Sequence, residues 1–80
     1  MSKLRIEETC NPQKRRSIET IVRNLGARFH AKVAKRKVTN NEGKINGTLI
    51  LVLEAPRKHL KAIKLAIKQD ERFEGVPKFV

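Results

Sequence analysis

The chain has 80 residues, and its 19 lysine and arginine residues against eight acidic ones give a formal net charge of +11. This length predicts one small domain over residues 1–80, and grouped aliphatic residues such as those in Thr48–Leu53 exclude full disorder. A single cysteine excludes an intrachain disulfide and a cysteine-based metal cluster. Phosphate polymers and anionic membranes are the usual partners of so basic a chain, and a lysine-rich surface without a specific partner is the alternative.

The N-terminal residues lack the apolar segment of a secretory signal. No run approaches the ~18–20 apolar residues that a membrane-spanning helix needs. Together with the lone cysteine, this pattern predicts a soluble protein of the reducing cytoplasm. A protein that lies on a membrane surface is the weakest alternative, because the predicted helices have no spare apolar face to insert.

The chain begins with a predicted strand and a predicted helix. Apolar and polar residues alternate over residues 3–8, as in a half-buried strand. Asn11 is a good N-cap and Pro12 fits a first helical turn. We therefore expect a helix from this point to about Asn24, with Gly26 as its left-handed C-terminal cap.

A hairpin is predicted to follow the first helix. The apolar period changes to two over Ala27–Val33, which predicts a second strand with an outer limit at about Thr39. Asn40–Gly43 is a typical hairpin turn, and Ile45–Glu54 is the expected third strand. Within that strand, Gly47 predicts a bulge or a tight bend.

The last third of the chain predicts a second helix and a short strand. Pro56 fits the first turn of this helix, whose apolar face consists of Leu60, Ile63 and Ile67. Residues 76–80 predict a closing strand, which Pro77 assigns to a sheet edge. The order is therefore β-α-β-β-α-β, the order of a ferredoxin-like plait. We expect a four-stranded antiparallel sheet with both helices on one face and the first and third strands in the centre.

The second helix carries a line of cations without an acid among them. At 100° per residue from Leu60, four basic residues fall between about 40° and 100°. They are Arg57, Lys61, Lys64 and Lys68. Like charges four residues apart repel by a few tenths of a kcal/mol, and this cost favours an anionic partner. The alternative is that the lysine stems only cover apolar surface while their charges stay in water.

Two further basic clusters are candidates for phosphate contacts. Lys35, Arg36 and Lys37 are expected near the tip of the hairpin, with Glu42 as the nearby acid, on a ribbon that could follow a nucleic-acid groove. A charged edge that prevents aggregation is the alternative. Lys14, Arg15 and Arg16 lie in the first turns of the first helix, where free backbone N–H groups favour anions. An exposed charged turn is an equally good interpretation there.

The sheet face opposite the helices is predicted to have an aliphatic centre and a cationic rim. Its expected residues are Lys3, Arg5, Arg28, His30, Lys32, Thr48, Ile50 and Val52. A dimer or partner interface would use Arg5, Arg28, His30, Ile50 and Val52. The chain's aromatic residues are Phe29, Phe73 and Phe79, and Phe29 is expected in the core. A base-stacking platform on this face is therefore not expected.

The sequence offers no set of residues suited to catalysis. Cys10 precedes a helix start, where a low-pKa thiolate is one option, but no second cysteine or nearby histidine supports it. His30 and His59 have no metal-ligand spacing, and the paired acids Glu7–Glu8 and Asp70–Glu71 are expected as solvated charges at element ends. We therefore expect a non-enzymatic protein without a metal or cofactor.

The chain resembles ACT-type regulatory domains at several positions. The similarity lies in the helix–glycine–strand pattern of Ile18–Phe29 and in the closing Gly75–Val76. It implies an open sheet face that forms a dimer, with a small ligand or a protein as partner. Pro12 matches the ligand loop of that family, whereas its aspartate and glycine are missing here. The RNA-recognition motif shares the topology, but its aromatic signatures on the first and third strands are absent.

These observations lead to two hypotheses of function. The first is a nucleic-acid-binding module for RNA or DNA, with mainly phosphate-backbone contacts, that acts as an accessory or regulatory component of a nucleoprotein assembly. The second is an ACT-like regulatory or protein-interaction domain that dimerises through its open sheet face. Under the second hypothesis, Ile50 and Val52 matter more than the cations of the second helix.

Overall fold

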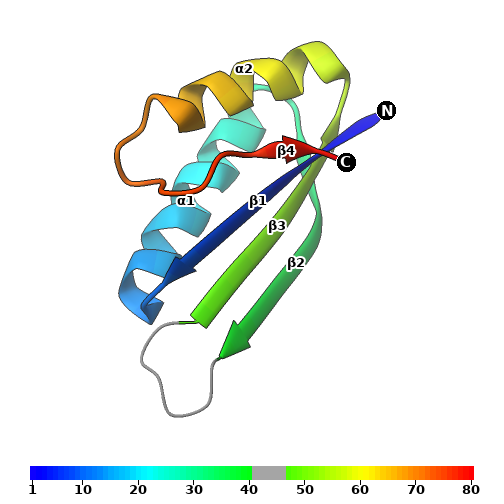
Figure 1. Ribbon diagram of the computed structural model, residues 1–80. Helices are drawn as coiled ribbons and strands as arrows, with labels where there is room; N and C mark the ends of the chain where they lie inside the picture. The colour runs from blue at the N-terminus through cyan, green and yellow to red at the C-terminus, as the bar shows by residue number, and fades with distance from the viewer. Residues whose placement is uncertain (41–46) are drawn as a thin grey trace.

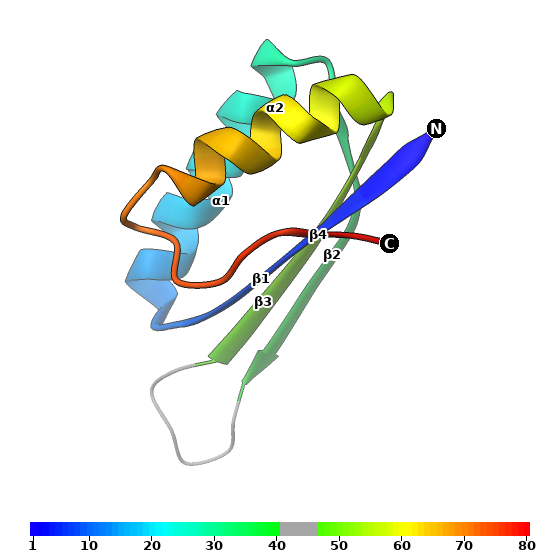
Figure 2. The ribbon, with the colours of Figure 1, turned by 45° about the horizontal axis from the view of Figure 1, so that its top comes forward.

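The computed structural model of the protein describes residues 1–40 and 47–80. The elements in chain order are β1 (Ser2–Cys10), α1 (Pro12–Arg28), β2 (Lys32–Asn40), β3 (Gly47–Ala55), α2 (Arg57–Lys68) and β4 (Lys78–Phe79) (Figure 1). All strand pairs are antiparallel, and the order β2-β3-β1-β4 puts β1 and β3 in the centre. Both helices cover the same face of the sheet (Figure 2). The predicted α+β architecture with four antiparallel strands and two helices is confirmed.

The core lies between the two helices and the central strands. In β1, Leu4 and Ile6 lie opposite Leu53 and Leu51 of β3, so that their side chains share the face toward the helices. The helices contribute the buried residues Ile18, Val22, Leu60, Ile63 and Ile67. Each such aliphatic side chain contributes ~1.5–3 kcal/mol on burial, which makes this layer the main source of stability. The predicted apolar face of the second helix is confirmed.

Helix α1 begins as predicted and ends later than predicted. The Asn11 side chain caps it by accepting a hydrogen bond from the Lys14 N–H at 2.8 Å. The helix continues through Gly26 to Arg28, and His30, with φ of 55°, takes the left-handed position. The Ala31 N–H then donates to the Gly26 carbonyl at 2.8 Å, the closing bond of a Schellman motif.

Gly26 is needed for close approach rather than for a positive φ. A Cβ atom at this position would lie 2.8 Å from the Ala31 carbonyl oxygen, which is too close for any side chain. The glycine therefore allows the backbone at Ala31 to pack directly against the last turns of α1. The prediction of Gly26 as the left-handed cap is wrong, because the turn is made four residues later by His30.

The boundaries of the hairpin strands also differ from the prediction. Strand β2 begins at Lys32, because residues 27 and 28 still belong to α1. Gly47 pairs in regular register with Cys10 and Asn40, so the described part of β3 has no bulge at this residue. The irregularity in register lies between Val33 and Lys35. The predicted turn at residues 40–43 and the start of the third strand at residue 45 fall largely outside the described residues.

The C-terminal elements are close to the prediction. Pro56 is the N-cap residue of α2 and precedes its first turn. Strand β4 pairs with β1 at the edge of the sheet, with Phe79 opposite Leu4 and Lys78 opposite Arg5. The short edge strand agrees with the expected effect of the preceding proline.

A buried carboxylate holds the segment that leads into β4. Glu8 of β1 is only 4% exposed, and its two oxygens accept hydrogen bonds from the N–H groups of Glu74 and Gly75 at 2.6 and 2.7 Å. A Cβ atom on Gly75 would lie 2.6 Å from the Glu7 carbonyl oxygen, so the segment passes very close to β1. The expectation of a solvated Glu8 is wrong, because the alternation of β1 turns this residue toward the helices.

Replacement of Glu8 by alanine should lower the free energy of unfolding by ~1–3 kcal/mol, since two part-buried hydrogen bonds to a charged acceptor would be lost. Urea denaturation followed by circular dichroism measures this change. The matched control is Glu7→Ala, whose carboxylate forms only an exposed 3.7 Å ion pair with Arg5 and should change stability by less than ~1 kcal/mol. Equal effects of the two substitutions would show that the Glu8 contacts do not stabilise the fold.

Candidate nucleic-acid interface

Four of the five lysine and arginine residues of α2 form a line along the helix flank nearest β4, which we call the α2 stripe. It consists of Arg57, Lys61, Lys64 and Lys68. Three of these side chains are exposed and Lys64 is half-buried. At 1.5 Å per residue, the stripe extends over about 16 Å. No member forms an ion pair with an acid among the described residues.

Phe79 of β4 lies beneath this stripe. Its pairing opposite Leu4 turns the ring toward the helix side of the sheet. The guanidinium carbon of Arg57 is 4.1 Å from the ring centroid, and Lys64 Nζ is 5.4 Å from it. A cation over an aromatic face gains ~0.5–1 kcal/mol at exposed sites. Phe79 therefore helps to hold two neighbouring cations in place.

A shallow hollow adjoins the ring. It is lined by Lys61, Lys64, Leu65, Lys68 and Phe79. Leu65 is 56% exposed, although it is a large aliphatic residue on a helix. The hollow thus combines an apolar floor with a rim of three lysines. Sequence analysis missed this site because only the pairing of β4 with β1 brings Phe79 to α2.

Of the seven described acids, five pair with cations outside the stripe, Glu8 accepts from backbone N–H groups, and Glu71 forms no ion pair. Lys14 pairs with Glu74 at 3.2 Å, and Lys32 pairs with Glu54 at 3.7 Å. Past the end of α2, Asp70 accepts from the Arg72 guanidinium at 2.6 and 2.9 Å and from the Arg72 N–H at 2.9 Å. These hydrogen bonds lower the pKa of Asp70 from 3.8 to about 2. Asp70, the first acid after the stripe in sequence, is therefore already engaged.

The cluster at residues 35–37 is divided between the two sides of the sheet. Lys35 and Lys37 lie opposite Val52 and Ile50 on the open face. Arg36 faces the helices, where its Nε and Nη2 atoms donate to Glu19 Oε1 of α1 at 3.1 and 2.8 Å. The expectation of three cations with only Glu42 nearby is wrong, because successive strand residues point to opposite faces.

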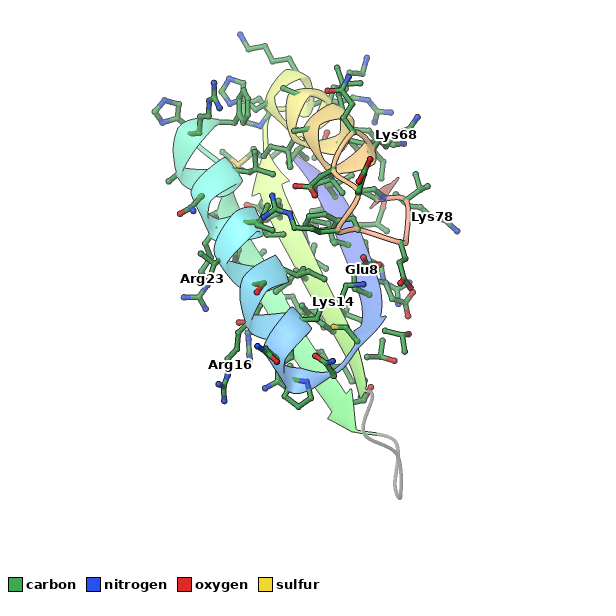
Figure 3. All side chains as sticks on the ribbon, turned by 90° about the vertical axis from the view of Figure 1, so that its left-hand side faces the viewer. Glu8, Lys14, Arg16, Arg23, Lys68 and Lys78 are labelled. Atoms are coloured by element: carbon green, nitrogen blue, oxygen red, sulfur yellow. The ribbon has the colours of Figure 1, made fainter. Side chains whose placement is uncertain are left out.

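The cluster at the start of α1 is partly neutralised and lies far from the stripe. Lys14 is paired with Glu74, and the buried Arg15 Nε is 4.0 Å from Glu19 Oε1, too far for a hydrogen bond. Arg16 is exposed, and with Arg23 it projects from α1 on the opposite side of the view from Lys68 and Lys78 (Figure 3). The three predicted clusters do not form one continuous surface.

The open sheet face has the expected aliphatic centre with a different rim. Ile50 lies between Glu7 and Lys37, and Val52 lies between Arg5 and Lys35. Lys3 and Lys32 flank Glu54 in the next row. Arg28 and His30 do not belong to this face, because they form the end of α1 and the turn after it. Their predicted part in a sheet-face interface is wrong for that reason.

The remaining reactive side chains are two histidines and one cysteine. The His30 and His59 rings come within 6.3 Å of each other, a proximity that sequence spacing did not indicate. Within the described residues, no group of three or more His, Cys, Asp or Glu side chains is arranged to hold a metal ion. Burial raises the pKa of Cys10, which is opposite to the shift that activates a thiol. The option of a low-pKa thiolate is therefore wrong.

Comparisons with known proteins give no family for this chain. It matches no protein-family model, and no curated protein is significantly similar to it in sequence. Neither described helix is both long enough and apolar enough to cross a membrane. Functional inference therefore depends on the arrangement of charge and apolar surface described above.

The Asp70–Arg72 pair should produce a distinct acid titration. Because the pKa of the carboxyl group is depressed in the folded protein, its stabilising effect is present above pH 3.8 and is lost as the pH falls through about 2. Carboxyl-carbon NMR should give a midpoint near 2 for the wild type and a midpoint close to 3.8 for Arg72→Ala. The control Arg16→Ala, a distant arginine, should leave the midpoint unchanged. A wild-type midpoint near 3.8 would mean that the pair does not form in solution.

Proposed function

We propose that the protein is a non-enzymatic nucleic-acid-binding module whose α2 stripe contacts the phosphate backbone. The observation that carries this proposal is the line of four cations that has no acidic partner among the described residues. The strand order and the two helices on one face support a ferredoxin-like plait as its fold. Its role would be that of an accessory or regulatory component of a nucleoprotein assembly in the cytoplasm.

The energetics of the stripe favour an anionic polymer. Arg57 and Lys61, like Lys64 and Lys68, are spaced four residues apart, and each such pair costs a few tenths of a kcal/mol. Several phosphates bound along about 16 Å of helix would relieve this repulsion and release counterions. A single small anion could contact only part of the line.

The basic surface continues around the short edge strand. Lys78 lies opposite Arg5 in the β1–β4 pairing and belongs to the open face, whereas its neighbour Phe79 faces α2. Lysine and arginine contacts to phosphates determine affinity and orientation without reading the bases. We therefore expect affinity that depends strongly on salt and weakly on sequence.

The second candidate function is a dimer formed through the open sheet face. The half-buried Ile50 and Val52 supply an apolar centre for it. Lys35 and Lys37 border that centre on one side, and Arg5 and Glu7 border it on the other. Cations outnumber the acids Glu7 and Glu54 on this face, so two such faces in contact would bring like charges together as they leave water, at a cost of several kcal/mol. Charge therefore favours nucleic acid over a second copy as the partner.

Reversal of charge in the stripe should weaken nucleic-acid binding and reduce its salt dependence. Fluorescence anisotropy with labelled RNA and DNA over a salt series measures both quantities. For Lys61→Glu/Lys64→Glu, loss of two phosphate contacts should reduce the log–log salt slope by ~1.4–1.8 or more.

The control for this prediction is Arg23→Glu/Lys58→Glu, which changes net charge by the same amount at exposed residues outside the stripe. It should retain most of the wild-type slope. If both double variants lose affinity equally, the charge acts only as a diffuse field. If the wild type does not bind at physiological salt, nucleic acid is not the partner.

The open sheet face should not mediate self-association. We expect a monomer in sedimentation velocity at micromolar concentration for the wild type and for Ile50→Thr/Val52→Thr. These substitutions keep β-branched side chains and the net charge while they remove apolar surface. A wild-type dimer that the double variant dissociates would favour the second candidate function.

A further inference from the structure

The α2 stripe includes a feature that phosphate contacts alone do not require. Phosphates need only cations and hydrogen-bond donors, yet the hollow here is lined by Leu65 and Phe79 together with three lysines. Leu65 is more than half exposed, and the Phe79 ring forms part of the same hollow. A ligand that fills this site must therefore combine negative charge with an apolar surface.

The Arg57–Phe79 pair adds a flat surface to this site. The guanidinium group is planar, and its carbon lies over the Phe79 ring, 4.1 Å from the ring centroid. The ring therefore shields the group from one side. Because Arg57 is exposed, its other side remains open to a planar partner. Stacking also reduces the entropy that Arg57 would lose when it binds a ligand.

Unpaired nucleobases have the properties that this site requires. They stack on aromatic rings and on arginine guanidinium planes, and each is joined to phosphates that the surrounding lysines could contact. In a duplex, by contrast, the base faces are stacked within the helix and only the backbone and groove edges are accessible. The hollow therefore favours a single strand over a duplex.

We propose that the nucleic acid bound at the α2 stripe is single-stranded and that one of its bases stacks on the Arg57–Phe79 pair over the hollow. Lys61, Lys64 and Lys68 contact the phosphates next to that base. This inference rests on the proposed function and adds to it the class of ligand and the residues that select it. Phe79, which the charge pattern did not indicate, becomes a specificity-determining residue.

The experiment compares three labelled probes by fluorescence anisotropy: a short oligothymidylate, an abasic deoxyribose-phosphate strand of the same length, and the oligothymidylate annealed to its complement. The wild type should bind the single strand about 5-fold or more tightly than the abasic strand, the lower end of the effect of one stacked base. It should also bind the single strand more tightly than the duplex.

Two variants test the stack without changing net charge. Arg57→Lys keeps the cation and removes the planar group, and Phe79→Leu keeps an apolar side chain and removes the ring. Each should lose about 5-fold or more in affinity for oligothymidylate, with an unchanged salt slope and unchanged affinity for the abasic strand. The matched control Lys58→Arg, at an exposed residue of α2 outside the stripe, should bind all three probes as the wild type does. Because Arg57 is exposed, its variant keeps the test valid if Phe79→Leu lowers stability.

The possible failures are distinguishable. If the wild type binds oligothymidylate and the abasic strand equally, or binds the duplex more tightly, the base-stacking inference is overturned and the proposed function stands. If an acidic peptide with leucine side chains displaces oligothymidylate at a lower concentration than unlabelled oligothymidylate does, the hollow is a protein-docking site and the inference is also overturned. If no probe binds at physiological salt, both the inference and the proposed function fail.

Discussion

The buried Glu8 carboxylate is the contact on which the arrangement of the candidate site depends. By accepting hydrogen bonds from the Glu74 and Gly75 N–H groups, it holds the C-terminal segment against β1. That position sets the register of β4, which in turn brings Phe79 beneath α2. A two-residue edge strand has few ladder hydrogen bonds of its own, so a charge-assisted anchor just before it has a large effect on its position.

Helix α2 has two functions on adjacent flanks. Its buried residues Leu60, Ile63 and Ile67 fix the helix on the sheet. The flank beside them therefore has a defined position relative to the sheet. The α2 stripe on that flank is then rigid in backbone even though lysine side chains are flexible. Ion pairs elsewhere, such as Arg36–Glu19 and Arg72–Asp70, engage five of the seven described acids with cations outside the stripe. The result is a local concentration of positive charge that the composition alone does not specify.

Sequence patterns predicted the elements and the core better than the surfaces. The N-cap at Asn11 and the apolar face of α2 follow from local rules, and both are confirmed. The predicted end of α1 was wrong because Gly26 is needed for close contact with Ala31. That need depends on the path of the chain after the helix. The predicted composition of the open face was only partly correct. Because α1 extends to Arg28, Arg28 and His30 lie outside the sheet. Glu8 was misassigned because its partners lie 66 and 67 residues away in sequence.

The sequence by itself determined the elements and the α2 stripe, because each arises from periodicity within one short segment, and the order of the elements led to the expected sheet. Only the tertiary structure decided which cations stand together without acids and which aromatic ring lies among them. Arg36 and Lys14 form ion pairs with Glu19 and Glu74, which come from other parts of the fold, so their charges are offset. Phe79 enters the site through strand pairing. Such contacts between distant segments depend on how the elements pack, and a local pattern carries no information about them.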